Sequence, residues 1–169
     1  MKRALRDNNP VVRINMSNIN GKAEAVNELL DFTVKYIPPE GLESIYFENW
    51  EAISELEGDI FSMISKKTIA LKEFTICYMA AVPEHMKQVF LTFLINIIKN
   101  APNLEKLSLE SAGMDGAYGD QICTALAQSK TTSLKDINLW GISGWYDTDT
   151  KCTAWSRVLS NQKQLNKLQ

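Results

Sequence analysis

An apolar phrase recurs along the chain with the spacing apolar-x-x-apolar-x-apolar-x-x-apolar. In one copy it is formed by Leu104, Leu107, Leu109 and Ala112. The alternation at its centre is typical of a short strand with one buried face, so the second and third apolar residues of each copy are predicted to point into a core. The copies begin at Val11, Leu42, Leu71, Leu104 and Leu134, and a sixth opens at Leu165.

Successive copies begin 31, 29, 33, 30 and 31 residues apart, and the period between them changes to that of a helix. Breakers at Pro38-Pro39 and at Pro102 are expected to end the first and third helices. Each unit is therefore predicted to be strand, turn, helix, turn, stacked on its neighbours. The helical stripes are Val26, Leu29, Leu30, Val34, Ile37; Ile53, Leu56, Ile60, Met63, Ile64; Met86, Val89, Phe90, Phe93, Leu94, Ile97, Ile98; Ile122, Ala125, Leu126; and Trp155, Val158, Leu159.

The segment from Asn103 to Ala112, followed by a helix, resembles the ribonuclease-inhibitor type of leucine-rich repeat. The resemblance runs from about Val11 onward. It implies an α/β solenoid, curved, with parallel strands on the concave face and helices on the convex face. Five full repeats of 29 to 33 residues and the start of a sixth would form a single domain over residues 1–169, expected to be a segment of a longer protein.

This chain departs from that family pattern in two respects. Its repeats are longer than usual, and the position that usually holds Asn or Cys is apolar, so packing is expected to replace the hydrogen-bonded Asn ladder. Irregular repeats of this kind resemble the C-terminal repeats of intracellular nucleotide-binding, leucine-rich-repeat innate-immune receptors. The apolar residues in question are Ile19, Trp50, Met79, Ala112 and Ile142.

Composition and charge narrow the classes of partner and compartment. The 169 residues are 45% hydrophobic and 22% charged, which is typical of a globular chain. A net charge of -2 without a basic stripe predicts no nucleic-acid partner and no membrane partner. The apolar run Val89–Ile98 is about half of the roughly 20 residues that a spanning helix needs. Three widely spaced cysteines and the lack of a signal peptide favour the cytoplasm.

Catalytic chemistry is not indicated. The only histidine, His85, follows Pro83-Glu84 and is expected to be an ordinary exposed residue. No phosphate-binding glycine loop and no metal-ligand spacing occurs, so neither an enzyme nor a cofactor is predicted.

The strand residues that alternate with the apolar ones are predicted to face outward and to be available to a protein partner. An irregular loop adds Trp145 and Tyr146, which either bind or cover an end of the core. The wide third helix is expected to bury Phe90, Leu91 and Ile95 rather than present them to a neighbouring domain. The candidate partner-binding residues are Arg13, Tyr46, Glu48, Tyr78, Glu110, Trp140, Trp145 and Tyr146.

The predicted function is recognition of a protein ligand, or of an adjacent domain of a longer parent chain, through the strand-lined face. The family resemblance implies sensor or regulatory repeats of an innate-immune receptor. The alternatives are a scaffold subunit of a stable assembly and the substrate-recruiting arm of a ubiquitin ligase, although the chain has no F-box. A solvated sheet face with no partner is the plainest alternative for the outward residues.

Overall fold

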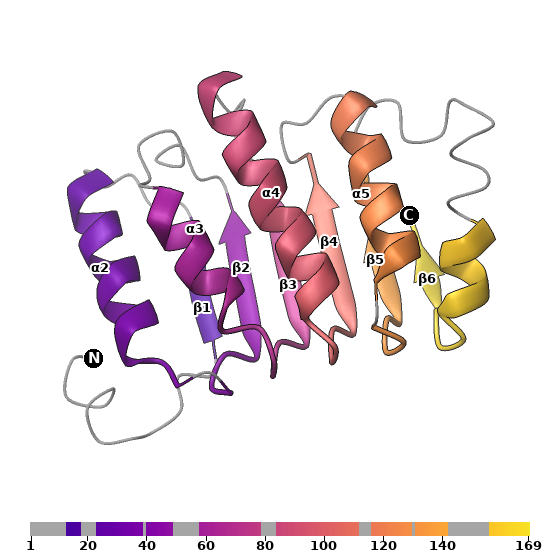
Figure 1. The fold of residues 1–169 in the computed structure, drawn as a ribbon, viewed down its shortest axis with the longest axis horizontal. Helices are drawn as coiled ribbons and strands as arrows, with labels where there is room; N and C mark the ends of the chain where they lie inside the picture. Colours follow the sequence, from indigo (N-terminus) through magenta and orange to yellow (C-terminus); the bar gives the residue numbers. More distant parts are fainter. Residues whose placement is uncertain are drawn as a thin grey trace.

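Strands and helices alternate along the chain and form two layers, a parallel sheet and a row of helices over one of its faces (Figure 1). The computed structural model describes residues 13–17, 23–38, 40–48, 58–78, 84–111, 116–129, 131–141 and 156–169. Within these ranges six strands lie side by side in chain order, and each pairs in parallel with the next. The sheet is open, because β1 and β6 each have a strand on one side only.

The helices and strands confirm the predicted alternation. The first helix ends at Tyr36, shortly before Pro38, and another ends at Asn100, shortly before Pro102. The strands are β1 (Arg13–Ser17), β2 (Ser44–Glu48), β3 (Glu73–Cys77), β4 (Lys106–Glu110), β5 (Asp136–Asn138) and β6 (Lys167–Leu168). The helices are α2 (Ala23–Tyr36), α3 (Gly58–Ser65), α4 (Glu84–Asn100) and α5 (Gly116–Gln128), and residues 156–161 are also helical.

The pairing register places equivalent positions of the predicted repeat opposite one another. Ile45 opposes Ile14 on one side and Phe74 on the other, and Leu107 continues the row on β4. These side chains are buried beneath the helices. A slip of one residue would turn each apolar set outward, so the alternation fixes this register.

The core lies between the sheet and the helices and is richest in aromatic rings near α4. Phe93 has its ring centroid 4.7 Å from that of Phe61 on α3 and 5.7 Å from that of Phe74 on β3. Phe90 and Leu91 are fully buried and Ile95 packs partly buried against the core, as expected for the wide helix. One aromatic cluster therefore joins a strand to two helices.

The predicted helical stripes are wider than the buried faces. Leu29 on α2 is 38% exposed, and Val89 on α4 and Leu159 in the segment 156–161 are exposed as well. Each lies at the margin of its stripe, on the flank of its helix. Neighbouring helices and the sheet cover only the central arc, so the prediction that these three residues are buried is wrong.

The turns that lead into the strands carry a regular polar ladder. The carbonyl of Glu43 accepts hydrogen bonds from the N–H groups of Lys72 and Glu73, and the carbonyl of Lys72 accepts from Glu105 and Lys106. The side chains alternate in charge along the same row. Lys72 Nζ lies 3.4 Å from Glu43 Oε1, and Lys135 Nζ lies 2.8 Å from Glu105 Oε2. The ion pair with Lys135 holds the pKa of Glu105 below its usual value.

Side-chain hydrogen bonds join adjacent units at the ends of the helices. Ser129 Oγ donates to the carbonyl of Ile98 at 2.7 Å, and Gln162 Nε2 donates to the carbonyl of Thr131 at 2.7 Å. The five apolar positions at which the Asn ladder was predicted to be missing lie outside the described residues. Polar contacts at the start of each strand therefore link the units. The Asn ladder of the family would lie at the opposite end, and the sequence did not predict the contacts at the start.

Three equivalent residues after the strands adopt a left-handed backbone conformation. Tyr78, Ser111 and Gly141 have φ angles of 52°, 47° and 78°. Each stands three residues after the matched positions Thr75, Ser108 and Asn138. A Cβ on Gly141 would lie 2.7 Å from Ser111 Oγ, so both the backbone angle and the available space favour glycine there.

Candidate functional site

The face of the sheet that the helices leave uncovered is called here the open face. Cross-strand register arranges its side chains in three rows that run across the strands. The rows follow the predicted outward positions. The first row is Arg13, Ser44, Glu73, Lys106, Asp136 and Lys167; the second is Asn15, Tyr46, Thr75, Ser108 and Asn138; the third is Ser17, Glu48, Cys77 and Glu110.

The third row continues to Trp140, two residues beyond Asn138. The N–H of Ser111 donates to the carbonyl of Trp140 at 2.7 Å, which keeps Trp140 beside the residue that follows Glu110. The side chain of Asn138 accepts a hydrogen bond from the N–H of Trp140 at 3.0 Å. Trp140 is therefore held next to the third row, and 59% of the residue's surface is exposed.

A hollow of about 340 Å³ lies in the open face between β2 and β6. Its centre is lined by the short side chains of Thr75 and Ser108, whereas Tyr46 and Tyr78 line one side and Lys106 lies at the start of β4. This space exists because the second row has short residues on β3 and β4, whereas the same row has Tyr46 on β2. The hollow is thus a product of the register, since its lining residues come from five strands.

The open face is not purely solvated. Thr75, Cys77 and Ser108 are buried, and Cys77 is only 5% exposed. The expectation that outward strand residues have no packing role is wrong for these three. Tyr46 shows this directly, since Cys77 Sγ donates to the Tyr46 hydroxyl at 3.5 Å.

Both residues of this pair lose their protons at a higher pH than the isolated side chains do, because both pKa values are raised. The hydrogen bond with Cys77, then burial, raises the pKa of Tyr46. Burial is the largest cause that raises the pKa of the Cys77 thiol, and the charges of Glu48 and Glu110 act in the same direction. Cys77 is therefore a neutral, covered thiol at neutral pH and not an activated nucleophile.

Tyr78 and Glu110 form the second pair of the site. A hydrogen bond to Glu110, and then the charge of Glu110, raise the pKa of Tyr78. Asn138 Nδ2 donates to Glu110 Oε2 at 3.5 Å, and the backbone N–H of Tyr78 donates to the carbonyl of Glu110 at 3.0 Å. The Tyr78 side chain is 54% exposed although its backbone occupies a region that favours glycine. An exposed ring on a strained residue has no evident role in packing.

The structure brings together some of the predicted partner-binding residues and separates others. Tyr46, Tyr78 and Glu110 line the hollow, and Glu48 and Trp140 belong to the adjoining third row. Arg13 is exposed on β1, beyond the strands that line the hollow. Trp145 and Tyr146 lie outside the described residues.

Of the residues at the start of the strands, sequence reasoning assigned only Arg13 to the site. Lys106, Asp136 and Lys167 also line the hollow and stand in one register row with alternating charge. The repeat aligns Lys106 and Asp136 with Arg13 as outward strand positions, and Lys167 belongs to the sixth copy of the phrase, but none of these residues is aromatic.

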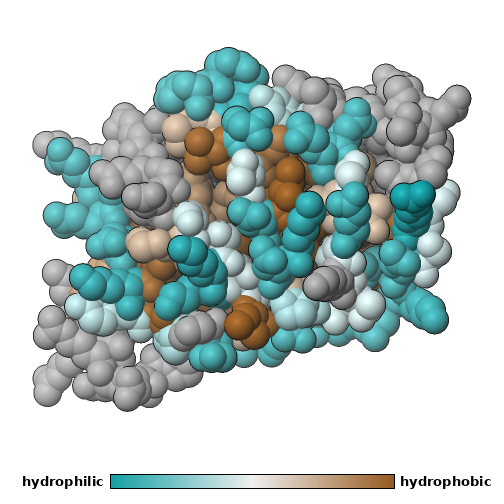
Figure 2. All heavy atoms as spheres, viewed as in Figure 1, coloured by the Kyte–Doolittle hydropathy of each residue, from teal (hydrophilic) through white to brown (hydrophobic). Residues whose placement is uncertain are grey.

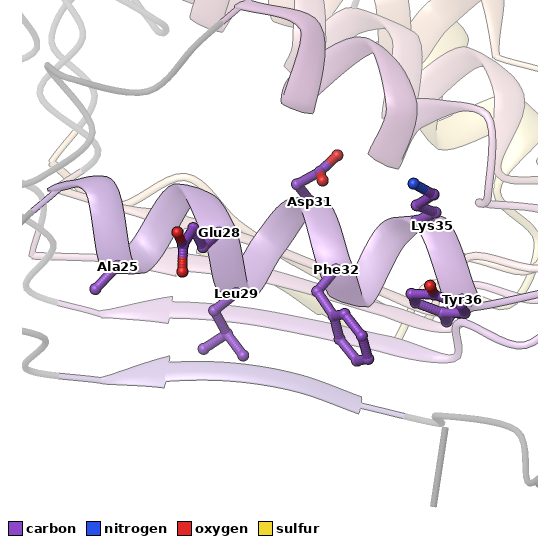
Figure 3. A pocket seen from close by; sticks show the side chains of 7 residues that line it. All are labelled: Ala25, Glu28, Leu29, Asp31, Phe32, Lys35 and Tyr36. Atoms are coloured by element: carbon purple, nitrogen blue, oxygen red, sulfur yellow. The ribbon is translucent and has the colours of Figure 1, made fainter. Parts of the chain in front are cut away.

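Two further hollows lie along helices of the described part of the chain. The larger, about 500 Å³, lies along α2 alone, where Figure 3 shows Leu29 and Phe32 on one side of the helix and Asp31 and Lys35 on the other. The second, about 300 Å³, lies between α3 and α4 over Phe61 and Phe93. Figure 2 shows hydrophobic atoms in the furrows between helices that are otherwise covered by hydrophilic residues. These hollows lie along the sides of helices, and few polar groups in their linings point toward a common centre.

The described residues contain no group of three or more histidine, cysteine, aspartate or glutamate side chains that could hold a metal ion. His85 is exposed on the first turn of α4, as expected. Among the same residues, every helix is too short or too polar to cross a membrane.

Comparison with protein-family models, with curated proteins and with solved structures finds no match to this chain. The open face itself is therefore the basis on which a function is assigned.

Proposed function

We propose that this chain is a protein-binding module of the leucine-rich repeat type, whose open face is the concave surface of a solenoid and binds a protein partner without catalysis. The partner is a separate protein or an adjacent domain of a longer chain, in the cytoplasm. By resemblance of the repeats, the module belongs to the sensor region of an innate-immune receptor.

The observation that carries the proposal is the pairing of exposed aromatic rings with a hollow on the open face. Tyr78 and Trp140 are 54% and 59% exposed, and neither ring is needed to close the core. Tyrosine and tryptophan supply large contact area with few rotatable bonds, so they are frequent anchors in protein interfaces. Carboxylates and lysines beside these rings form the polar surroundings that such interfaces have.

A protein ligand fits this face better than a small substrate. The hollow extends across five strands of the open face, and the one thiol in its lining, Cys77, is buried and protonated rather than activated as a nucleophile. Three parallel rows on a rigid sheet present side chains at regular spacing to an extended or folded partner.

The test is affinity capture from a native lysate with the wild-type chain and with the double variant Tyr78→Gly/Trp140→Ala. Glycine suits the left-handed backbone at residue 78, so this variant removes both rings with little damage to the fold. We expect one protein to be captured by the wild type and lost with the variant, with binding weakened by about tenfold or more, the scale of an interface anchor.

The matched control is Val89→Ala/Leu159→Ala, which removes two exposed apolar side chains from the helix side. It should retain the captured protein, and circular dichroism should show the same fold for all three proteins. Equal capture by wild type and open-face variant, with loss in the helix-side control, would move the binding surface to the helices and refute the proposal.

A further inference from the structure

Two hydroxyl groups at the centre of the hollow have no hydrogen-bond partner in the described part of the chain. Thr75 and Ser108 oppose each other in the register of β3 and β4, and they are 9% and 6% exposed. Both residues line the hollow, yet neither hydroxyl forms a hydrogen bond with a described residue. A hydroxyl that is covered without a partner costs free energy, so this pair indicates a position where a ligand supplies the missing hydrogen bonds.

The neighbouring polar side chains toward the end of the strands are already paired. The Tyr46 hydroxyl accepts from Cys77, and the Asn138 amide donates to Glu110 and accepts from the N–H of Trp140. The hydrogen bonds of this end are therefore made within the chain. Those that are not made lie at the centre of the hollow and at the start of the strands.

The start of the strands adds uncompensated positive charge to the hollow. Lys106, Asp136 and Lys167 line it and are neighbours in the first row, and none of them forms an ion pair within the described part of the chain. Two lysines and one aspartate leave one net positive charge. Lys106 precedes Ser108 by two residues on the same face of β4, or roughly 7 Å, a distance that its flexible side chain can cross. Glu110 is twice as far along the same strand.

We propose that the hollow binds a carboxylate group of the protein partner, which accepts hydrogen bonds from the Thr75 and Ser108 hydroxyls and pairs with the ammonium group of Lys106. The inference rests on the proposed function, since it names the group that the same face recognises. An ionised carboxylate only accepts hydrogen bonds, and both hydroxyls and the ammonium group can donate. A chain terminus and an acidic side chain both supply this group. An apolar ligand would leave both hydroxyls unpaired, and a cation would meet the two lysines.

The experiment is an NMR titration with three small probes that differ in whether and where they have a carboxylate. N-acetylglutamine has a terminal one, the α-amide of N-acetylglutamate has a side-chain one, and N-acetylglutamine amide has none. We expect saturable shifts of the backbone amides of Thr75, Lys106 and Ser108 with at least one carboxylate probe and none with the neutral probe. The tighter carboxylate probe identifies the source that the partner uses. Equal shifts with all three probes, or no saturable shift with either carboxylate, would overturn the proposal.

The variant Thr75→Val/Ser108→Ala separates binding from folding. It should weaken the carboxylate probe by about tenfold or more, because two hydrogen bonds to a charged group are lost. Its urea midpoint should equal or exceed that of the wild type, because the hydroxyls have no partner among the described residues to lose. Unchanged probe binding, or a clearly lower midpoint, would show that these hydroxyls do not form the site.

Lys106→Gln tests the ammonium group without a change at the centre of the hollow. It should weaken both carboxylate probes, whereas the matched control Arg13→Gln should not, because Arg13 stands in the same row beyond the strands that line the hollow. Equal weakening in both variants would mean that the probes respond only to overall charge, which would overturn the site.

The capture experiment judges the proposed function separately. A captured protein that is lost with Tyr78→Gly/Trp140→Ala but kept with Thr75→Val/Ser108→Ala would leave the proposed function standing and refute the carboxylate site.

Discussion

Tyr78, Ser111 and Gly141 occupy the same place in three successive units and all have a left-handed backbone, yet only one of them is glycine. For an ordinary residue this conformation costs about 1 to 2 kcal/mol relative to the right-handed one. At Tyr78 the residue with this backbone also has an exposed ring that lines the hollow. Strain of this kind is found where function, rather than stability, selects the residue.

Comparison of Tyr78→Gly with Tyr78→Ala isolates this cost. Both variants lack the ring, so they differ in backbone preference alone, and we expect the glycine variant to be more stable by about 1 kcal/mol. Urea unfolding gives the two free energies. The control is Asn138, which lies in strand β5, where alanine should be more stable than glycine. An alanine variant at residue 78 as stable as the glycine variant would show that the left-handed angle is not maintained in solution.

At the scale of strands and turns, alternating charge accompanies the backbone ladder that joins each unit to the next. Glu43, Lys72, Glu105 and Lys135 follow one another at the entry to β2, β3, β4 and β5. Each acid is flanked by a base of the adjacent turn, so a register shift would place like charges together. The ladder thus adds an electrostatic preference to the register that the apolar alternation already sets.

The pKa of Glu105 reports on this ladder. It is lowered because Lys135 donates a hydrogen bond to its carboxylate and adds a positive charge, so Lys135→Gln should return it toward the usual glutamate value in an NMR titration. A lowered folded-state pKa means that the pair contributes to stability above the unfolded-state pKa. That contribution is lost as the pH falls through the folded value. An unchanged Glu105 titration in Lys135→Gln would contradict the assigned cause, and Lys87→Gln serves as a distant control on α4.

The strands and their register could be predicted from the sequence, because each apolar alternation has only one orientation that buries Leu107 and its equivalents. The exposure of Leu29 and Val89 could not be predicted from the sequence, because the part of a helix that is covered depends on how close its neighbours lie. The aromatic and acidic residues of the site were predicted from their outward positions. The hollow was not predicted, because it arises where the short side chains of Thr75 and Ser108 lie beside the longer Tyr46.

The described strands and helices form two rows in which each element contacts the one before and after it in its own layer. The central strands β3 and β4 have partners on both sides and lie beneath the aromatic cluster around Phe93, whereas β1 and β6 have one neighbouring strand each. In such arrays stability is close to a sum of unit terms and nearest-neighbour interfaces. Protection against local opening should therefore fall from the centre toward both edges of the described sheet.

Native-state hydrogen exchange tests this gradient. Amides of β3 and β4 are expected to exchange most slowly and those of β1 and β6 fastest. Phe93→Ala should cost about 3 to 5 kcal/mol, because it empties a buried site where a strand and two helices meet. Its effect should be largest in β3, whose Phe74 contacts Phe93, and smaller in β6, which is three strands away. Equal exchange rates in all six strands would show that the array opens as one unit. The hollow, which spans β2 to β6, would then be as rigid at its edge as at its centre.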